Sequence, residues 1–121
     1  MQDWFIDYLK LEYKKYISLM ARSLNIQDLA LGSSHGNYGY IPNNNGFNLA
    51  NTSQDLYTSY SLYLYVQNLP LLKNIFLFYS IFSPGYNLIL SGESHFATIY
   101  KLLYNIDYNK IAPPPQIKYH I

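Results

Sequence analysis

Short apolar runs alternate with longer helix-like segments along this chain of 121 residues, and this alternation constrains the fold most strongly. Runs at residues 26–31, 47–50 and 74–82 are typical of strands, and the last has the apolar density of a buried parallel strand. Segments 3–24, 54–68 and 93–106 show helical spacing. Strands separated by helices form βαβ units. We therefore expect an α/β fold, a parallel sheet between two helical layers.

Residues 54–68 also alternate like a strand, so this segment is open to two interpretations. A capping-box pattern of Thr52 and Asp55 before it, and Pro70 after it, favour a helix.

The first segment, residues 3–24, divides into a polar and an apolar face. Its polar stripe is Asp3, Asp7, Lys10, Lys14, Ser18 and Arg22, and its apolar face is Phe5, Leu9, Tyr16, Met20 and Leu24, widened by Trp4, Tyr8 and Leu11. A membrane-surface helix would need a strongly basic polar face. Packing on the sheet is therefore the favoured interpretation.

Two segments predict irregular structure. Residues 35–46 are rich in Gly and Asn and contain Pro42, which indicates a surface loop. Three prolines at 113–115 end regular structure, so residues 112–121 form a tail. We treat residues 1–121 as one domain. It is expected to be incomplete, because it has three predicted strands and a complete sheet of this type has about five.

Composition excludes several classes of function. Charged residues make up 12% of the chain and the net charge is +1, which disfavours nucleic-acid binding, since proteins that rely on phosphate contacts normally carry a basic excess. The chain has no cysteine, which excludes disulfides, thiolate zinc sites and cysteine nucleophiles. Its three histidines are scattered, so no metal or other cofactor is expected. No membrane-spanning run or secretory signal is recognisable, which favours a cytoplasmic location.

The loops that follow the three predicted strands are the candidate site, because ligands of parallel sheets bind at the carboxyl ends of the strands. They comprise residues 32–39, 50–55 and 80–85. Gly32 permits a sharp turn, and Ser33 and Ser34 offer hydroxyls and backbone amides for an oxyanion. Taken alone, these serines fit a nucleophile or an ordinary loop.

Two blocks resemble the SGNH (GDSL-like) hydrolases. The sequence from Leu29 to His35, Leu-Ala-Leu-Gly-Ser-Ser-His, resembles the first block, with Ser34 in the place of the nucleophile and Ser33 in that of the usual aspartate. The sequence from Phe47 to Ser53, Phe-Asn-Leu-Ala-Asn-Thr-Ser, resembles the second block. A bacterial subgroup with the GSSH start is often linked to surface-polysaccharide loci.

The resemblance implies a flavodoxin-like three-layer fold and a serine esterase or acyl transferase acting on ester-linked groups, glycan O-acyl groups among them. Ser34 would attack the carbonyl, and the amides of Ser34 and Ser53 would stabilise the oxyanion. Gly32, Ser33, His35 and Asn48 would complete the site loops.

The chain departs from the family pattern in two places. The third block has an asparagine that the sequence from Tyr79 to Gly85 lacks, and Asp-x-x-His, which supplies the base, does not occur before the chain ends. The resemblance thus covers the N-terminal portion of such a domain, and we expect ester hydrolysis near background. The alternative is a non-catalytic module of polysaccharide biosynthesis that binds a ligand or partner at the same loops.

The third predicted strand, residues 74–82, would expose an apolar edge if its neighbour in the sheet is missing. Lys73 provides a charge at one end only. Open apolar edges pair with other chains. We therefore expect the chain to dimerise through this edge or to aggregate.

Overall fold

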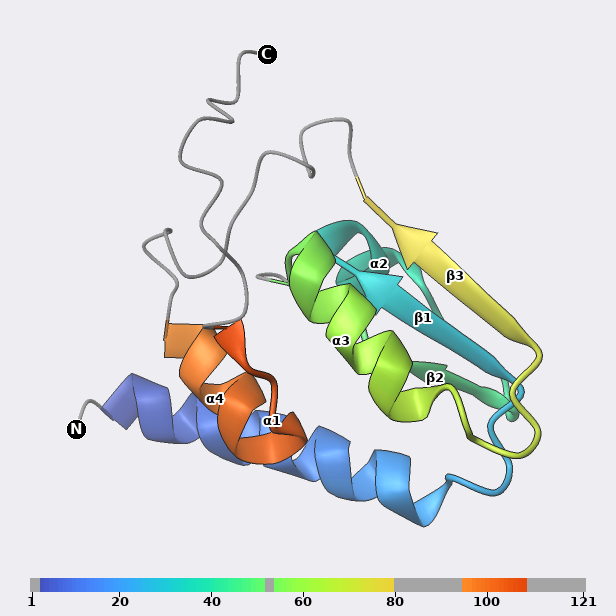
Figure 1. Ribbon diagram of the computed structural model, residues 1–121, viewed down its shortest axis with the longest axis horizontal. Helices are drawn as coiled ribbons and strands as arrows, with labels where there is room; N and C mark the ends of the chain where they lie inside the picture. The colour runs from blue at the N-terminus through green and yellow to red at the C-terminus, as the bar shows by residue number, and fades with distance from the viewer. Residues whose placement is uncertain (1–2, 52–53, 80–94, 109–121) are drawn as a thin grey trace.

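The computed structural model describes residues 3–51, 54–79 and 95–108 of the chain. Its elements follow the order helix, strand, helix, strand, helix, strand, helix (Figure 1). They are α1 (Asp3–Ala21), β1 (Asp28–Gly32), α2 (Ser34–Gly39), β2 (Gly46–Asn48), α3 (Leu56–Val66), β3 (Asn74–Phe78) and α4 (His95–Tyr104). The predictions for residues 80–94, the loop 80–85 included, and for the tail 112–121 lie outside the described residues.

The three strands form a parallel sheet in the order β2-β1-β3, which confirms the predicted α/β fold class. This is the order of the first three strands of a flavodoxin-like sheet. Within the described sheet, β1 is the central strand and is almost wholly buried. The expectation that the third strand would be buried on both faces is wrong for the described residues 74–78, because Phe76 is 42% exposed and Leu77 is 65% exposed.

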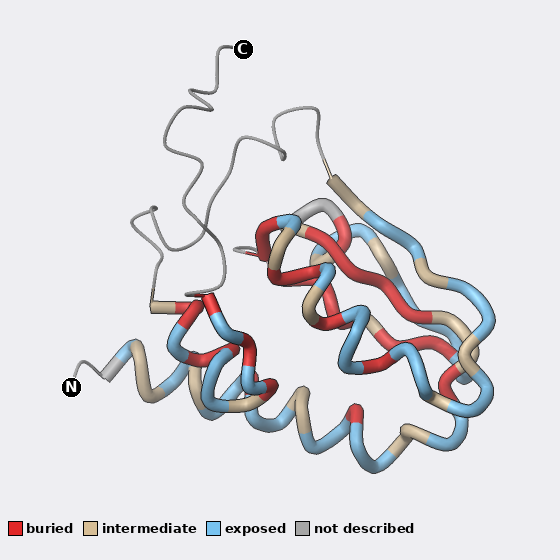
Figure 2. Tube along the Cα trace, in the orientation of Figure 1, coloured by how far each residue is buried: buried red, intermediate tan, exposed pale blue. Residues whose placement is uncertain are grey.

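Helices lie on both faces of the sheet. Figure 1 shows α3 in front of β1 and α2 behind it. Leu29 and Leu31 of β1 join the core beneath α3, where Leu62 and Val66 are buried (Figure 2). On the opposite face, the ring of Tyr40 lies 5.9 Å from the ring centroids of both Phe76 and Phe78. The sheet is therefore sandwiched between a large helical layer and a small one.

The helix predicted over 3–24 exists, but part of its apolar face was wrongly assigned. Met20 and Leu24 are exposed, as are Trp4, Tyr8 and Leu11, and Leu24 follows the end of α1. The inward stripe is Phe5, Leu9, Glu12, Tyr16 and Leu19. This stripe was not recognised in the sequence because Glu12 lies in the middle of it, and a carboxylate is rarely buried without a partner.

The prediction of a loop over residues 35–46 is wrong for residues 35–39, which belong to α2. Gly36 makes this possible, because a Cβ there would lie 2.9 Å from the Cβ of Ala50 and 2.9 Å from Cδ2 of Phe78. Glycine thus marks the close packing of a short helix on the sheet rather than an irregular chain.

The helical interpretation of residues 54–68 is confirmed by α3, but its N-cap is Asp55 rather than Thr52. The side chain of Asp55 accepts a hydrogen bond from the backbone N of Thr58 at 2.8 Å. Thr58 stands three residues after the cap, which is the geometry of an N-cap acceptor. Thr52 itself lies outside the described residues.

Helices α1, α3 and α4 meet around Tyr104. Its ring centroid lies 5.3 Å from that of Tyr16 in α1 and 5.2 Å from that of Tyr65 in α3. Aromatic packing therefore explains several of the chain's 15 tyrosines without a functional role. In the described part of the chain, no helix combines the length and apolar character needed to span a bilayer.

Candidate functional site

The turn that follows β1 is the centre of the candidate site, and it depends on Gly32. Gly32 has a φ of +134°, where side-chain-bearing residues are strained. A Cβ at this position would also collide with the Phe78 backbone, lying 2.8 Å from its N atom. The turn therefore requires glycine both for its conformation and for the close approach of β3.

The residues after Gly32 form the start of α2. Ser33 is the N-cap residue, and its backbone N donates to the carbonyl O of Phe78 at 3.0 Å. Ser34 and His35 are the first two residues of α2, and their side chains lie outside the description. Ser34 thus stands at the carboxyl end of the central strand, as the sequence predicted.

The loop after β2 lies directly beside this turn. The backbone N of Asn51 donates to the carbonyl O of Gly32 at 3.0 Å. The two sequence blocks that resemble SGNH hydrolases are therefore adjacent in space. Ser53, the second predicted oxyanion donor, lies outside the described residues.

Asn48 holds α2 in place from the end of β2. Its Nδ2 donates to the carbonyl oxygens of Gly36 at 2.9 Å and Tyr40 at 3.1 Å, and its Oδ1 accepts from the backbone N of Ala50 at 3.0 Å. These bonds satisfy carbonyls at the end of a short helix. The contacts of Asn48 therefore give it a supporting role at the site.

Gln54 is a supporting residue that the sequence reasoning missed. Its Oε1 accepts from the backbone N of Gly32 at 2.8 Å, and its Nε2 donates to the carbonyl O of Leu49 at 2.8 Å. Ser59 donates to the same Oε1 and also contacts the hydroxyl of Tyr79. Burial raises the pKa of Tyr79 to about 12, so this hydroxyl stays protonated. The network ties the ends of β1 and β3 to α3.

Two charged residues of α1, Glu12 and Lys15, were also missed. Asn51 Nδ2 donates to Glu12 Oε1 at 2.7 Å, and Lys15 Nζ donates to the carbonyl O of Ala50 at 2.7 Å. Burial raises the pKa of Glu12 and lowers that of Lys15, and the attraction between the two charges opposes both shifts. Their spacing of three residues on the inward face was the signal that the sequence offered.

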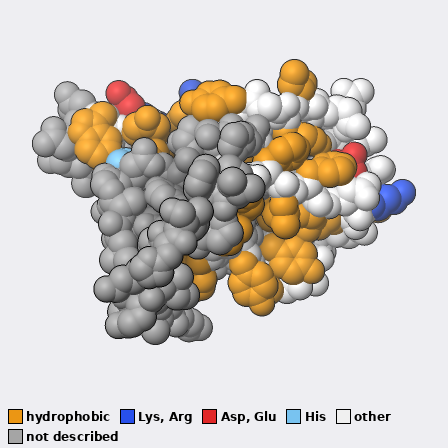
Figure 3. Space-filling view, turned by 90° about the horizontal axis from the view of Figure 1, so that it is seen from above, with side chains coloured by type: hydrophobic (Ala, Val, Ile, Leu, Met, Phe, Trp, Pro, Cys, Tyr) orange, Lys and Arg blue, Asp and Glu red, His pale blue; other side chains and the backbone are white. Residues whose placement is uncertain are grey.

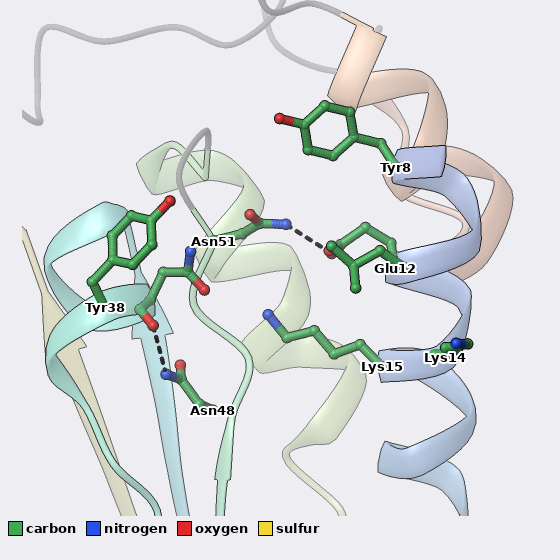
Figure 4. Close-up of a pocket in the computed structure, with 9 residues that line it drawn as sticks. Tyr8, Glu12, Lys14, Lys15, Tyr38, Asn48 and Asn51 are labelled. Atoms are coloured by element: carbon green, nitrogen blue, oxygen red, sulfur yellow. Dashed lines mark hydrogen bonds between the residues drawn. The ribbon is translucent and has the colours of Figure 1, made fainter. Parts of the chain in front are cut away.

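A cavity of about 570 Å³ lies between α1 on one side and α2, the end of β2 and the loop that follows β2 on the other. In Figure 4, Glu12 and Lys15 extend from α1 toward Asn51 and Asn48. The lining residues are Tyr8, Leu11, Glu12, Lys14, Lys15, Asn37, Tyr38, Asn48 and Asn51. The cavity therefore opens at the same edge of the sheet as the turn at Gly32.

A second, apolar groove of about 460 Å³ runs between α3 and β3. Hydrophobic side chains are widely exposed on the described surface seen in Figure 3. The groove is lined by Leu31, Leu56, Ser59, Tyr60, Tyr63, Ile75, Leu77 and Tyr79. Its composition suits an apolar partner rather than polar chemistry.

Candidate acids, bases and metal ligands are few in the described part of the chain. His95 is the one histidine whose side chain is described there, and its ring centroid lies 4.5 Å from that of Trp4 and 4.4 Å from that of Phe96. These contacts place it in an aromatic cluster at the start of α4. Over the same residues, no three acidic or histidine side chains are grouped to hold a metal ion.

Comparisons with known proteins found no matching family model, no matching curated protein and no matching solved structure.

Proposed function

We propose that this chain carries the nucleophile-bearing part of an SGNH-like serine esterase or acyl transferase that acts on ester-linked groups, glycan O-acyl groups included. The observation that carries the proposal is the hydrogen bond from Asn51 N to the carbonyl O of Gly32. It joins the two blocks on which the resemblance to this family rests. A serine at the carboxyl end of a central parallel strand also suits attack on a bound ester.

Backbone geometry around Ser34 favours an acyl site over an ordinary loop. Gly32 holds a backbone conformation that glycine adopts without strain but other residues do not, and it lies in close contact with the backbone of β3. Gln54, buried among α3 and the strand ends, fixes the amide of Gly32. This support would hold Ser34 at a constant position relative to a substrate.

Ester turnover by the chain should be close to background. A serine hydroxyl is a weak nucleophile without an adjacent base. Among the side chains that the structure describes, the ring contacts of His95 are with Trp4, Tyr8 and Phe96. Slow acylation of the nucleophile should therefore be easier to detect than turnover.

The experiment that tests this function is acylation with p-nitrophenyl acetate, followed by mass spectrometry of the peptides. We expect the acetyl group to accumulate on Ser34 and not on Ser18, an exposed serine of α1. The Ser34→Ala variant should lose the adduct, and Ser18→Ala should keep it. Acetylation spread evenly over exposed serines would contradict the proposal, and fast turnover lost in Ser34→Ala would reveal a base within the chain.

The alternative, a non-catalytic binding module, is favoured by one observation. The cavity beside the turn is lined mostly by polar side chains, several of which are held by hydrogen bonds. Such a cavity can bind a ligand without any reaction at Ser34. Saturable binding of a ligand, with no adduct at Ser34, would support this second function.

A further inference from the structure

The cavity between α1, α2 and the loop after β2 combines features that select one chemical class of ligand. Its volume of about 570 Å³ is within the range of about 300–1,000 Å³ that small-molecule pockets have. It is formed by side chains from distant parts of the chain, α1 on one wall and residues 37–51 on the other.

Both signs of charge occur on the α1 wall. Glu12 is 8% exposed, and it lies close enough to Lys15 for each charge to affect the pKa of the other. Lys14 adds a second ammonium group at the rim. The carboxylate of Glu12 would repel an anionic ligand, and the two lysines would repel a cationic ligand. The wall therefore suits a neutral ligand whose groups can both donate and accept hydrogen bonds.

The opposite wall supplies amide groups and aromatic rings. Asn37, Asn48 and Asn51 line it, and the backbone carbonyl and side-chain bonds described above hold Asn48 and Asn51 in place. In Figure 4, Tyr8 and Tyr38 lie on opposite sides of the cavity with their hydroxyls directed toward the space between them. Tyrosine rings present an apolar face and a polar end to a ligand.

We propose that this cavity binds a neutral polyhydroxylated ligand of the size of one sugar residue, held by Glu12, Lys15 and Asn51 and flanked by Tyr8 and Tyr38. A hydroxyl group can donate to Glu12 and accept from Lys15, so neighbouring hydroxyls match the paired charges. The inference deepens the proposed function, on which it rests for the identity of the substrate, by naming residues that would bind the part of the substrate that carries the ester.

The test is a titration of the ¹⁵N-labelled chain, followed by NMR, with methyl glucoside, glucuronate and glucosamine as neutral, anionic and cationic probes. We expect saturable shifts of the Asn37 and Asn51 side-chain amides with methyl glucoside, and binding at least threefold weaker with the two charged probes. Glucuronate as the tightest ligand, or no saturable binding of any probe, would overturn the proposal.

Two variants locate the binding. Tyr38→Ala should weaken binding of methyl glucoside at least threefold. The Tyr38 side chain is 77% exposed, so its removal should leave the fold intact. Tyr60→Ala, an exposed tyrosine of α3 outside this cavity, is the matched control and should bind as the wild type does. Equal binding by both variants would overturn the assignment of the cavity. Sugar binding involves no covalent step, so it can be observed even if Ser34 is not acylated, and Ser34 can be acylated even if no sugar binds. The two experiments therefore test the two proposals separately.

Discussion

The side-chain amide of Asn51 lies 2.7 Å from the carboxylate of Glu12, so the loop after β2 is tied to the inward face of α1. The same residue donates its backbone N to Gly32. One asparagine therefore links the first helix to the turn at the end of the central strand. A substitution of Glu12 should therefore alter the position of Asn51 and, through it, the turn at Gly32.

Burial of Glu12 predicts a characteristic dependence of stability on pH. Its pKa is raised above the ordinary value of 4.5, so the folded chain binds this proton more tightly than the unfolded chain. The stability due to the protonated group is fully present below about pH 4.5 and is lost as the pH rises through the folded-state pKa. Urea unfolding of wild type and Glu12→Gln between pH 4 and 8 should show the wild type losing stability relative to the variant.

Glu12→Gln keeps an acceptor for Asn51, so the comparison reports the charge rather than the hydrogen bond. Asp7→Asn, an exposed change on the same helix, is the control. A difference between wild type and Glu12→Gln that is constant over this pH range would contradict the prediction.

Gly32→Ala should destabilise the chain by about 3 kcal/mol or more, because strain at positive φ adds to a collision with backbone atoms of Phe78. Gly39→Ala is a matched control, because a Cβ there meets nothing within 4 Å. It should change the free energy of unfolding by less than about 0.5 kcal/mol. Urea denaturation measures both, and similar losses in the two variants would show that the turn does not need glycine.

Gln54→Leu should cost about 2–4 kcal/mol, since it preserves the volume but leaves the Gly32 N–H and the Leu49 carbonyl without their partner. Gln67→Leu, at the exposed end of α3, is the control and should have little effect. Thermal unfolding followed by circular dichroism would compare them. A neutral Gln54→Leu would mean that the buried network contributes no net stability.

Among the residues that the structure describes, β3 is an edge strand, and this predicts self-association. Phe76 and Leu77 are exposed on this strand, and the apolar groove beside it is uncharged. Light scattering after size-exclusion chromatography should show a dimer or larger species that dissociates on dilution, and Leu77→Lys should favour the monomer. Leu102→Lys on α4 is closely matched, since both leucines are 65% exposed. A monomer at every concentration of the wild-type chain would contradict the prediction.

Apart from α2, the order of elements could be predicted from the sequence, because apolar spacing indicated most elements and the flanking Asp55 and Pro70 indicated a helix over 54–68 where the spacing was ambiguous. The short helix α2 could not, because the glycines that indicate a loop also permit the close contact of Gly36 with Ala50. The turn after β1 was anticipated from Gly32, Ser33 and Ser34. Glu12 and Gln54 were missed, since the value of a buried polar side chain depends on partners that only the fold brings together.

The central claim, that Ser34 stands at a site built for acyl chemistry, can be tested most directly with thiol variants, because the chain has no cysteine of its own. Ser34→Cys and Ser18→Cys are each reacted with p-nitrophenyl acetate and, separately, with iodoacetamide, and the ratio of the two rate constants is taken. Alkylation forms no oxyanion, so the ratio isolates stabilisation of the acylation transition state. We predict a ratio at least tenfold higher for Ser34→Cys. Equal ratios for the two variants would contradict the account.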